Sequence, residues 1–299
     1  MTLHTSPTVG RRAGFTLVEI MVVMVIIGLL AAILVPVLGG ILRRTNEAAV
    51  KVEISSLESA LADFRARFGC DPPDHIHLHE TAAGWAQHGE DRSKILAIWP
   101  RFRFYDRAYL SFPYDTVAGE VQLSGAECLV FFLGGMPKKD ANGKFYMTGF
   151  SKNPLNPFAP ITPGTDESRD GPFFEFPSAR LIDIDVGRNG TQLGDAKDGF
   201  PEFKDSLNNQ TAPYLYLSSS GGRGYDEHGG YVFFHPPEPQ TNPPFVHSFF
   251  LNRVSPYQTT TGGPGWNAKS FQIISPGFGP HENASGKFCP YGVKLVYDP

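Results

Sequence analysis

The first regular feature of the chain is an uninterrupted apolar run. From Ile20 to Leu42 every residue is apolar, glycine or proline, and no charged side chain occurs. An α-helix rises about 1.5 Å per residue, so the run is long enough to cross the roughly 30 Å hydrocarbon core of a bilayer. This pattern predicts a transmembrane helix over residues 15–42.

A different pattern follows over residues 43–69. Apolar residues recur at alternating steps of four and three, the spacing of one face of a helix. They are Val50, Ile54, Leu57, Leu61, Phe64 and Phe68. Gly69 and then Pro72-Pro73 end the pattern. We therefore expect one long helix from about Phe15 to Phe68, bent at Pro36, whose second half packs on a globular domain.

Residues 70–299 contain short apolar segments separated by glycine- and proline-rich turns. The spacing predicts strands at 181–186, 214–217, 231–234, 271–277 and 292–297, and a buried helix or strand at 124–133. Residues 71–107 lack periodicity and are expected to be irregular, apart from an extended stretch at 74–80. Together the patterns predict an α+β fold, with a long N-terminal helix on a C-terminal domain that has a mainly antiparallel sheet.

Composition and charge narrow the functional classes. The 32 Gly and 26 Pro among 299 residues indicate a loop-rich domain, and the 24 Phe and 11 Tyr indicate a packed aromatic core. The formal net charge is −4, and no basic stripe with interleaved aromatic residues occurs. Nucleic acid is therefore not an expected partner.

The residues before the apolar run form a basic leader. Arg11 and Arg12 are followed by the small residues Ala13 and Gly14, and the first acidic residue is Glu19. In a secretory signal peptide the small residues follow the apolar run, whereas here they precede it. Cleavage at Gly14 would keep the apolar helix on the mature chain. A carboxylate at the edge of the hydrocarbon is costly, so Glu19 is expected to have a partner.

This arrangement resembles the type IV prepilin and type II secretion pseudopilin family, although the motif covers only the first tenth of the chain. The resemblance implies a pilin-like fold and cleavage of the leader, residues 1–14, between Gly14 and Phe15 by a prepilin peptidase. It implies N-methylation of Phe15 and pairing of Glu19 with the N-terminal amine of a neighbouring subunit. Pro36 matches the proline that kinks the helix in many family members.

The resemblance also implies a function. The chain is expected to be a structural subunit, a pseudopilin of a type II secretion system that forms a short filament for protein export. The alternative is a type IV pilus subunit, or a minor tip pilin with an adhesive domain. The implied partners are the prepilin peptidase, other pilin or pseudopilin subunits and an inner-membrane secretion platform.

Charge around the apolar run predicts the orientation of the chain. Arg11 and Arg12 precede the run and favour a cytoplasmic N-terminus, although Arg43 and Arg44 weaken the asymmetry. We expect a single-pass protein of the bacterial inner membrane, with residues 70–299 in the periplasm or outside the cell.

Catalytic motifs are missing from the sequence. Gly221-Gly222-Arg223-Gly224 is not followed by the Lys-Ser/Thr of a phosphate-binding loop. Neither a Gly-x-Ser-x-Gly nor a His-Glu-x-x-His pattern occurs. We therefore expect no enzymatic activity.

Three histidines form one candidate metal site. In an extended segment His75, His77 and His79 lie on the same side, because side chains alternate with period two. Imidazoles so spaced are ligands for zinc, nickel or copper. The simpler interpretation is the polar face of an exposed edge strand.

Four aspartates form a second candidate metal site. The segment 181–186 alternates and leads into glycine-rich turns, and its carboxylates Asp183 and Asp185 are followed by Asp195 and Asp198. Oxygen ligands on such turns suit calcium, although the spacing is not that of an EF-hand. The default interpretation is a solvated turn. No cofactor is required, and calcium is the candidate ion.

The three cysteines allow at most one intramolecular disulfide. Cys128 lies in an apolar segment and is expected to be unpaired, which leaves Cys70 with Cys289 as the suggested pair. The sequence does not choose among the three pairings.

Overall fold

The structure is a computed structural model of the chain and describes only part of its length. The described residues are 16–104, 120–161, 168–183, 199–207, 213–219, 225, 267, 269–275, 281–282 and 288–289. Side chains are not described at 34–43, 120, 122, 281–282 and 288–289. The chain forms two compact units, Met1–Ala48 and Ala49–Pro299.

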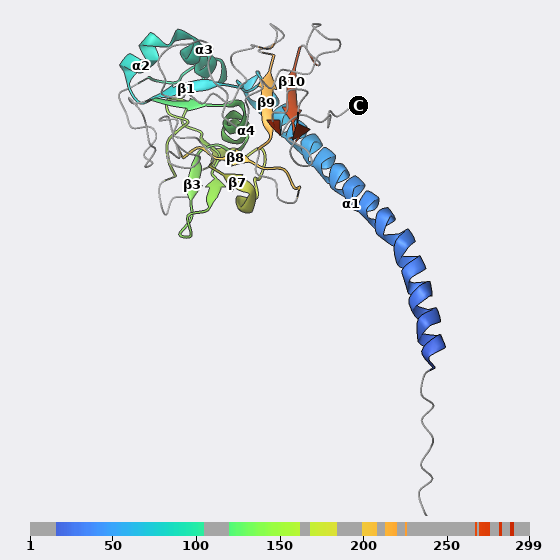
Figure 1. Cartoon of the computed structure of the whole chain (residues 1–299). Coiled ribbons are helices and arrows are strands. Elements are labelled where there is room, and N and C mark those ends of the chain that lie inside the picture. Colours follow the sequence, from blue (N-terminus) through green and yellow to red (C-terminus); the bar gives the residue numbers. More distant parts are fainter. Residues whose placement is uncertain are drawn as a thin grey trace, which may run out of the picture. The chain divides into compact units, whose positions relative to one another are not determined.

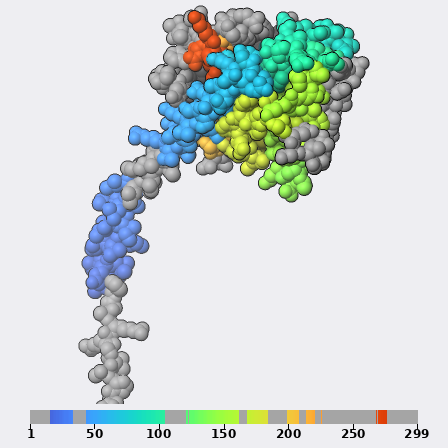
Figure 2. Space-filling model, turned by 180° about the vertical axis from the view of Figure 1, so that it is seen from behind, coloured from blue at the N-terminus to red at the C-terminus, as the bar shows by residue number. Residues whose placement is uncertain are grey.

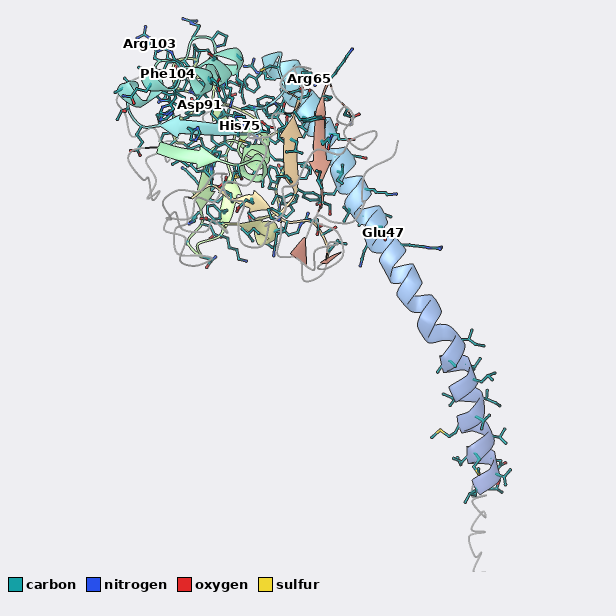
Figure 3. All side chains as sticks on the ribbon, turned by 45° about the horizontal axis from the view of Figure 1, so that its top comes forward. Glu47, Arg65, His75, Asp91, Arg103 and Phe104 are labelled. Atoms are coloured by element: carbon teal, nitrogen blue, oxygen red, sulfur yellow. The ribbon has the colours of Figure 1, made fainter. Side chains whose placement is uncertain are left out.

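Helix α1 extends from Leu17 to Phe68, which confirms the long N-terminal helix. In the first unit, every large apolar side chain from Leu17 to Ile33 is at least half exposed. Figure 3 shows side chains projecting from all sides of this segment. Nowhere in the described part of the chain does a helix combine the length and hydropathy that a membrane crossing requires. The side chains of 34–43, which the predicted span includes, lie outside the description.

The second-unit part of α1 contributes one face to the domain core. Val50, Ile54, Leu57, Leu61 and Phe64 are each at most 2% exposed, so the predicted amphipathic stripe is confirmed. Figure 2 shows this part of α1, in light blue, lying against the yellow-green segment that contains residues 168–183. The helix ends as expected, because Gly69 adopts a left-handed φ of 80° and its N–H donates to the Arg65 carbonyl.

Residues 71–107 are more regular than predicted. Strand β1, Ile76–His79, pairs antiparallel with β2, Glu120–Leu123. Helices α2, Ala82–Gln87, and α3, Gly89–Ile98, follow β1 directly. The expectation of an irregular region was wrong because these helices are short and bury few side chains. The buried set in α2 is Trp85 alone, too little to produce a periodic signal.

Helix α4, Gly125–Gly134, is the centre of the second unit and resolves the helix-or-strand ambiguity in favour of a helix. All its residues are buried. It packs against β2, β8 and β9 (Figure 1). Ser124 and Glu127 form a capping box at its start. At its end, a Cβ on Gly135 would lie 2.2 Å from the backbone of Gly149, so only glycine fits there.

The remaining described strands pair two by two and antiparallel, rather than forming one larger sheet. The pairs are β3 Pro137–Lys139 with β4 Phe145–Met147, β5 Phe150–Ser151 with β6 Arg169–Asp170, β7 Leu181–Ile182 with β8 Glu202–Phe203, β9 Leu215–Ser218 with β10 Phe271–Ile274, and β11 His281–Glu282 with β12 Phe288–Cys289. A 3-10 turn, η1, covers Ser178–Arg180. The strand predicted at 214–217 and the strand and turn predicted at 271–277 are confirmed at β9 and β10. Strand β7 confirms the first two residues of the strand predicted at 181–186, of which 184–186 lie outside the described residues, as do the strands predicted at 231–234 and 292–297.

The core is built largely from aromatic rings, as the composition predicts. Phe131 of α4 lies 5.0–5.6 Å, centroid to centroid, from Phe132, Phe150, Phe158 and Phe200. Such tilted and edge-on contacts add stability beyond the burial of area. This core fixes α1, α4 and the short strands as the scaffold for the polar groups described next.

Candidate functional site

The N-terminus of α1 carries a reciprocal pair of hydrogen bonds between Thr16 and Glu19. The backbone N–H of Thr16 donates to Glu19 Oε2 at 2.8 Å, and the Glu19 N–H donates to Thr16 Oγ1 at 3.2 Å. The Thr16 hydroxyl also donates to the same carboxylate oxygen at 2.9 Å. This is a capping box, which satisfies two N–H groups that a helix start leaves without partners.

The capping box gives Glu19 a local partner that sequence reasoning did not identify. The signal was present, because Thr16-Leu17-Val18-Glu19 matches the Ser/Thr-x-x-Glu pattern immediately before an apolar run. The role predicted for Glu19, a contact with a neighbouring subunit, is not tested by these bonds. Of the other predicted processing and assembly residues, Gly14 and Phe15 lie outside the described residues. Pro36 lies within α1, with its side chain outside the description.

A partly buried polar network joins the second-unit part of α1 to the rest of the domain. Glu53 on α1 accepts from both terminal nitrogens of Arg180, with Nη1 to Oε2 at 2.9 Å, and Oε2 also accepts from the Tyr214 hydroxyl at 2.7 Å. Burial alone would lower the pKa of Arg180, but the hydrogen bonds and charge of Glu53 outweigh it and raise that pKa. Burial, reinforced by Glu53, raises the pKa of Tyr214 far above its ordinary value. The network therefore favours a charged Arg180 and a neutral Tyr214.

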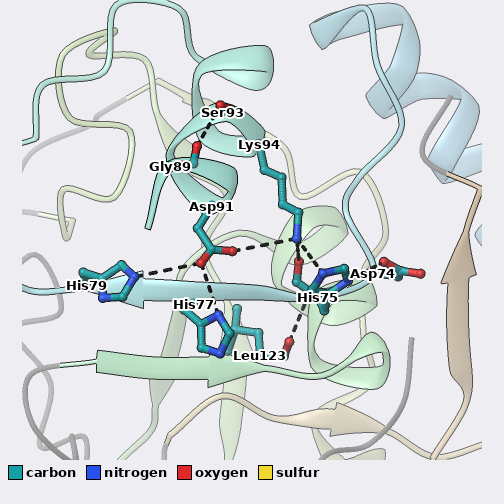
Figure 4. A network of polar contacts seen from close by, with 10 residues as sticks. Asp74, His75, His77, His79, Gly89, Asp91, Ser93, Lys94 and Leu123 are labelled. Atoms are coloured by element: carbon teal, nitrogen blue, oxygen red, sulfur yellow. Dashed lines mark hydrogen bonds and ion pairs between the residues drawn. The ribbon is translucent and has the colours of Figure 1, made fainter. Parts of the chain in front are cut away.

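The predicted histidine segment contributes to two polar groups, one around His75 and one around Asp91, which an ion pair between Lys94 Nζ and Asp91 Oδ1 at 3.8 Å joins (Figure 4). His75 Nδ1 lies 2.9 Å from Asp74 Oδ1, and its Nε2 lies 2.7 Å from Lys94 Nζ. His77 Nδ1 instead lies 3.1 Å from Asp91 Oδ2. Figure 3 shows His75, which immediately precedes β1, and Asp91, which lies on the neighbouring helix α3.

Asp91 of α3 is the centre of the second group. Its Oδ2 lies 4.0 Å from His79 Nε2, and the His79 ring stacks on His88 with centroids 4.3 Å apart. Burial alone would raise the pKa of Asp91, but the hydrogen bond with His77 and the charge of Lys94 outweigh it and lower that pKa. Among the described residues, no three His, Cys, Asp or Glu side chains are placed to hold a metal ion. The three predicted histidines are therefore engaged with carboxylates, a lysine and each other.

The predicted aspartate site is described only at its first member. Asp183 follows β7 and is buried, with its Oδ2 4.0 Å from Lys139 Nζ. The acidic position therefore lies toward the protein rather than on the solvent-facing side of a turn. Asp185, Asp195 and Asp198 lie outside the described residues.

The described cysteines are free thiols. Cys128 is fully buried in α4, as expected, and burial raises the pKa of its thiol well above the ordinary value. Cys70 is also free, so the suggested pairing with Cys289 is wrong. The Cys70 side chain is half-buried and lies against the apolar core. Burial, and then the negative charge of Asp71, raise its pKa.

Comparison with known proteins identifies the N-terminal segment. Residues 10–35 match the family model described as the prokaryotic N-terminal methylation motif. The chain is 51% identical over 51 residues to type II secretion system core protein G of Pectobacterium carotovorum subsp. carotovorum, and 45% identical over 51 residues to the protein of the same name from Aeromonas hydrophila.

These likenesses cover a limited part of each protein. The aligned 51 residues are 17% of this chain and 33% and 36% of the two relatives. The chain thus spans about a third of the length of the curated relatives it matches. No solved structure matches the chain significantly. The methylation motif is therefore established for residues 10–35, while the fold of the second unit rests on its own structure.

Proposed function

We propose that this chain is a pilin-like structural subunit, a pseudopilin of a type II secretion system, which assembles into a short helical filament for protein export. The single observation that carries the proposal is the N-terminal methylation motif at residues 10–35. The relatives that share this segment are named as type II secretion core proteins, which favours secretion over a type IV pilus.

Processing is the first step of the proposed pathway. A prepilin peptidase cleaves between Gly14 and Phe15, removes the basic leader and leaves Phe15 to be N-methylated. The small residues stand before the apolar run, so cleavage there keeps the run on the mature chain.

The apolar run then anchors the subunit in the bacterial inner membrane. No charge occurs between Ile20 and Leu42, and the large side chains described in this run are exposed on all sides of α1. A helix that is apolar all round requires either lipid or neighbouring helices to cover it. The leader arginines favour a cytoplasmic N-terminus, which places the second unit outside the cytoplasm.

Assembly uses the start of α1. The capping box keeps the Glu19 carboxylate at the helix N-terminus, next to where the amine of a mature chain would begin. In the filament we propose that this carboxylate pairs with the N-terminal amine of a neighbouring subunit, because an unpaired charge in an apolar bundle is costly. A head-to-tail contact of this type repeats without closing and therefore produces a helical filament.

The second unit is proposed to be a structural head rather than an enzyme. Its α1 segment is held by six buried apolar side chains and by the Glu53–Arg180–Tyr214 network. A force on the helix is thereby transmitted to the folded domain. The partners in this account are the peptidase, other subunits and the inner-membrane secretion platform.

The proposal is tested by expressing the chain with a prepilin peptidase and the other components of a type II secretion system. Wild type is expected to be shortened by the leader and to enter sheared, sedimenting filaments. Gly14→Val, which places a bulky side chain before the cut, is expected to block cleavage and serves as the control for processing. A shortened wild-type chain that never enters filaments would contradict the assembly role.

A further inference from the structure

Three histidine rings lie together where β1 meets the junction of α2 and α3, and the proposed filament function makes no use of them. The His79 ring stacks on the His88 ring, with centroids 4.3 Å apart and an interplanar angle of 18°. The His77 ring lies 6.3 Å from the His79 ring and 6.1 Å from the His88 ring. A metal ion beside the nearly parallel stacked rings cannot lie in both ring planes, where the nitrogen lone pairs point. The stacked pair is therefore suited to binding protons.

The two stacked rings differ in their exposure to solvent. His79 is 3% exposed, whereas His88 is exposed. Helix α2 lies directly against His79, because a Cβ on Gly84 would be 3.0 Å from the His79 Cβ. The Trp85 ring also meets the His79 ring edge-on, with centroids 5.1 Å apart. A buried imidazole thus has an exposed imidazole against its face.

His88 also joins the two helices. It is the C-cap residue of α2 and the N-cap residue of α3. Its Nδ1 lies 3.0 Å from the carbonyl oxygen of Gly84. A carbonyl only accepts, so Nδ1 carries a hydrogen and the neutral ring keeps its lone pair on Nε2. A second proton on this ring therefore places a positive charge directly at the junction of α2 and α3.

Asp91 of α3 supplies negative charge beside the rings, but it is already engaged. Its Oδ2 lies 3.1 Å from His77 Nδ1 and 4.0 Å from His79 Nε2, and its Oδ1 lies 3.8 Å from Lys94 Nζ (Figure 4). The positive charge of Lys94 offsets that of the carboxylate. Asp91 would therefore compensate only part of the repulsion between two charged rings 4.3 Å apart.

Other charged groups lie on the elements next to β1. Glu90 and Arg92 of α3 are exposed, so water screens their charges. Glu80 follows β1 and is half-buried, and Glu120 of β2 is the register partner of His79, with its side chain outside the description. Helix α2 has no charged residue. Because the stacked rings are in contact, no counter-charge can lie between them.

We propose that the His79–His88 stack is an acid-sensitive switch, which loosens α2 and α3 from β1 below about pH 6. Neutral rings stack, whereas two charged rings in contact repel each other. A charged His79 also requires hydration, which it gains only if α2 and α3 move away. The open arrangement therefore binds more protons than the closed one, so falling pH favours opening and rising pH favours closure.

Hydrogen exchange followed by mass spectrometry tests the switch on the full chain in detergent. Samples at about pH 7.5 and about pH 5.5 contain EDTA, and exchange times are scaled to the intrinsic rate at each pH. Protection of residues 82–98 is expected to be about tenfold or more lower at the acidic pH, because like charges at this distance repel strongly even near a surface. Helix α4 is fully buried and has no histidine, so residues 125–134 should keep their protection. Equal protection of 82–98 at both pH values, or a parallel loss in α4, would overturn the proposal.

His88→Asn removes the exposed ring of the stack. An asparagine does not titrate, and its amide can donate to the Gly84 carbonyl as His88 Nδ1 does. This variant is expected to protect residues 82–98 equally at both pH values. His88 is exposed, so the replacement keeps the fold. A tenfold acid response that persists in His88→Asn would contradict the assignment to the stack.

Two further variants separate the stack from its neighbours. His75→Asn is the matched control, because His75 contacts Asp74 and Lys94 outside the stack, and it should retain the acid response. Asp91→Asn removes the neighbouring negative charge and is expected to enlarge the difference between the two pH values. Loss of the response in His75→Asn, or a smaller difference in Asp91→Asn, would contradict the proposed switch.

Discussion

Glu53 of α1 and Arg180 of η1, 127 residues apart in the sequence, are joined through two hydrogen bonds. The Glu53 side chain is 12% exposed and that of Arg180 is 24% exposed, so the pair is only partly shielded from water. The Tyr214 hydroxyl completes the set of donors to Glu53. This contact joins α1 to a segment that is distant in the sequence. The stability of the second unit is therefore expected to depend in part on its contact with α1.

Tyr214→Phe tests this attachment with the smallest change available. It removes one of the two donors to Glu53 Oε2, which still accepts from Arg180, so the unfolding free energy is expected to fall by about 0.5–1.5 kcal/mol. Thermal unfolding of the detergent-solubilised chain measures the change. Tyr146→Phe, which alters an exposed tyrosine of β4, is the matched control and should change stability little. Equal stability of the wild type and Tyr214→Phe would contradict the account of the network.

Gly135→Ala is expected to be strongly destabilising. The added Cβ would lie 2.2 Å from the backbone of Gly149, and the residue has a φ of 88°. Backbone strain of about 1–3 kcal/mol and overpacking of about 1–3 kcal/mol both apply. Chemical denaturation measures the sum as a shift in midpoint.

Gly143→Ala separates the two causes. Gly143 has a similar φ of 77°, but a Cβ there would meet no atom within 4 Å. Its replacement should therefore cost only the backbone strain, about 1–2 kcal/mol. If Gly143→Ala lowers the free energy of unfolding as much as Gly135→Ala does, the close approach of Gly135 to Gly149 does not contribute to the effect.

The sequence predicts those parts of the fold in which a periodic apolar pattern corresponds to a large buried surface. The stripe from Val50 to Phe64 and its stop at Gly69 were predicted because burial enforces the helical period and glycine ends the helix. Helices α2 and α3 were missed because they are short, with 6 and 10 residues, bury few side chains, and have positions set by tertiary contacts, such as that of Trp85 in the core.

The candidate site was predictable only in part for a similar reason. The motif around Gly14, Phe15 and Glu19 is local, so the sequence displays it fully. The partners of the histidines come from α3, which was not predicted, so the contacts of His75 with Lys94 and of His77 with Asp91 could not be foreseen.

Cys70 provides a prediction about pH. Thiolate is the reactive form, and burial together with Asp71 raises the pKa of Cys70 above the ordinary value of 9.0. Alkylation at Cys70 by iodoacetamide, followed by peptide mass spectrometry, should therefore keep rising as pH increases beyond 9. Cys128, which is fully buried, should be alkylated only after unfolding.

Asp71→Asn tests the cause of that shift. Removing the carboxylate takes away a negative charge that raises the pKa, and it also leaves the Arg65 guanidinium without its partner. The pH midpoint of Cys70 alkylation should move down. A midpoint that moves up would show that Asp71 does not act on the thiol as described.

Glu19 can be tested for its two roles separately. Glu19→Gln retains a side-chain oxygen that can accept from the Thr16 N–H, whereas Glu19→Ala loses both the cap and the charge. If Glu19 pairs with a neighbouring amine, both variants are processed but neither forms filaments. Normal filaments from Glu19→Gln, with a defect only in Glu19→Ala, would assign the residue to capping alone. Sheared fractions examined by electron microscopy provide the measurement.

The most direct test of the central claim is the N-terminus of the mature chain. The protein is purified from membranes of cells that contain a prepilin peptidase, and its N-terminal peptide is sequenced by tandem mass spectrometry. The account predicts a chain that starts at Phe15 with a methylated amine and retains the apolar residues 20–42. A chain that starts at Met1, or at any residue beyond Leu42, would contradict it.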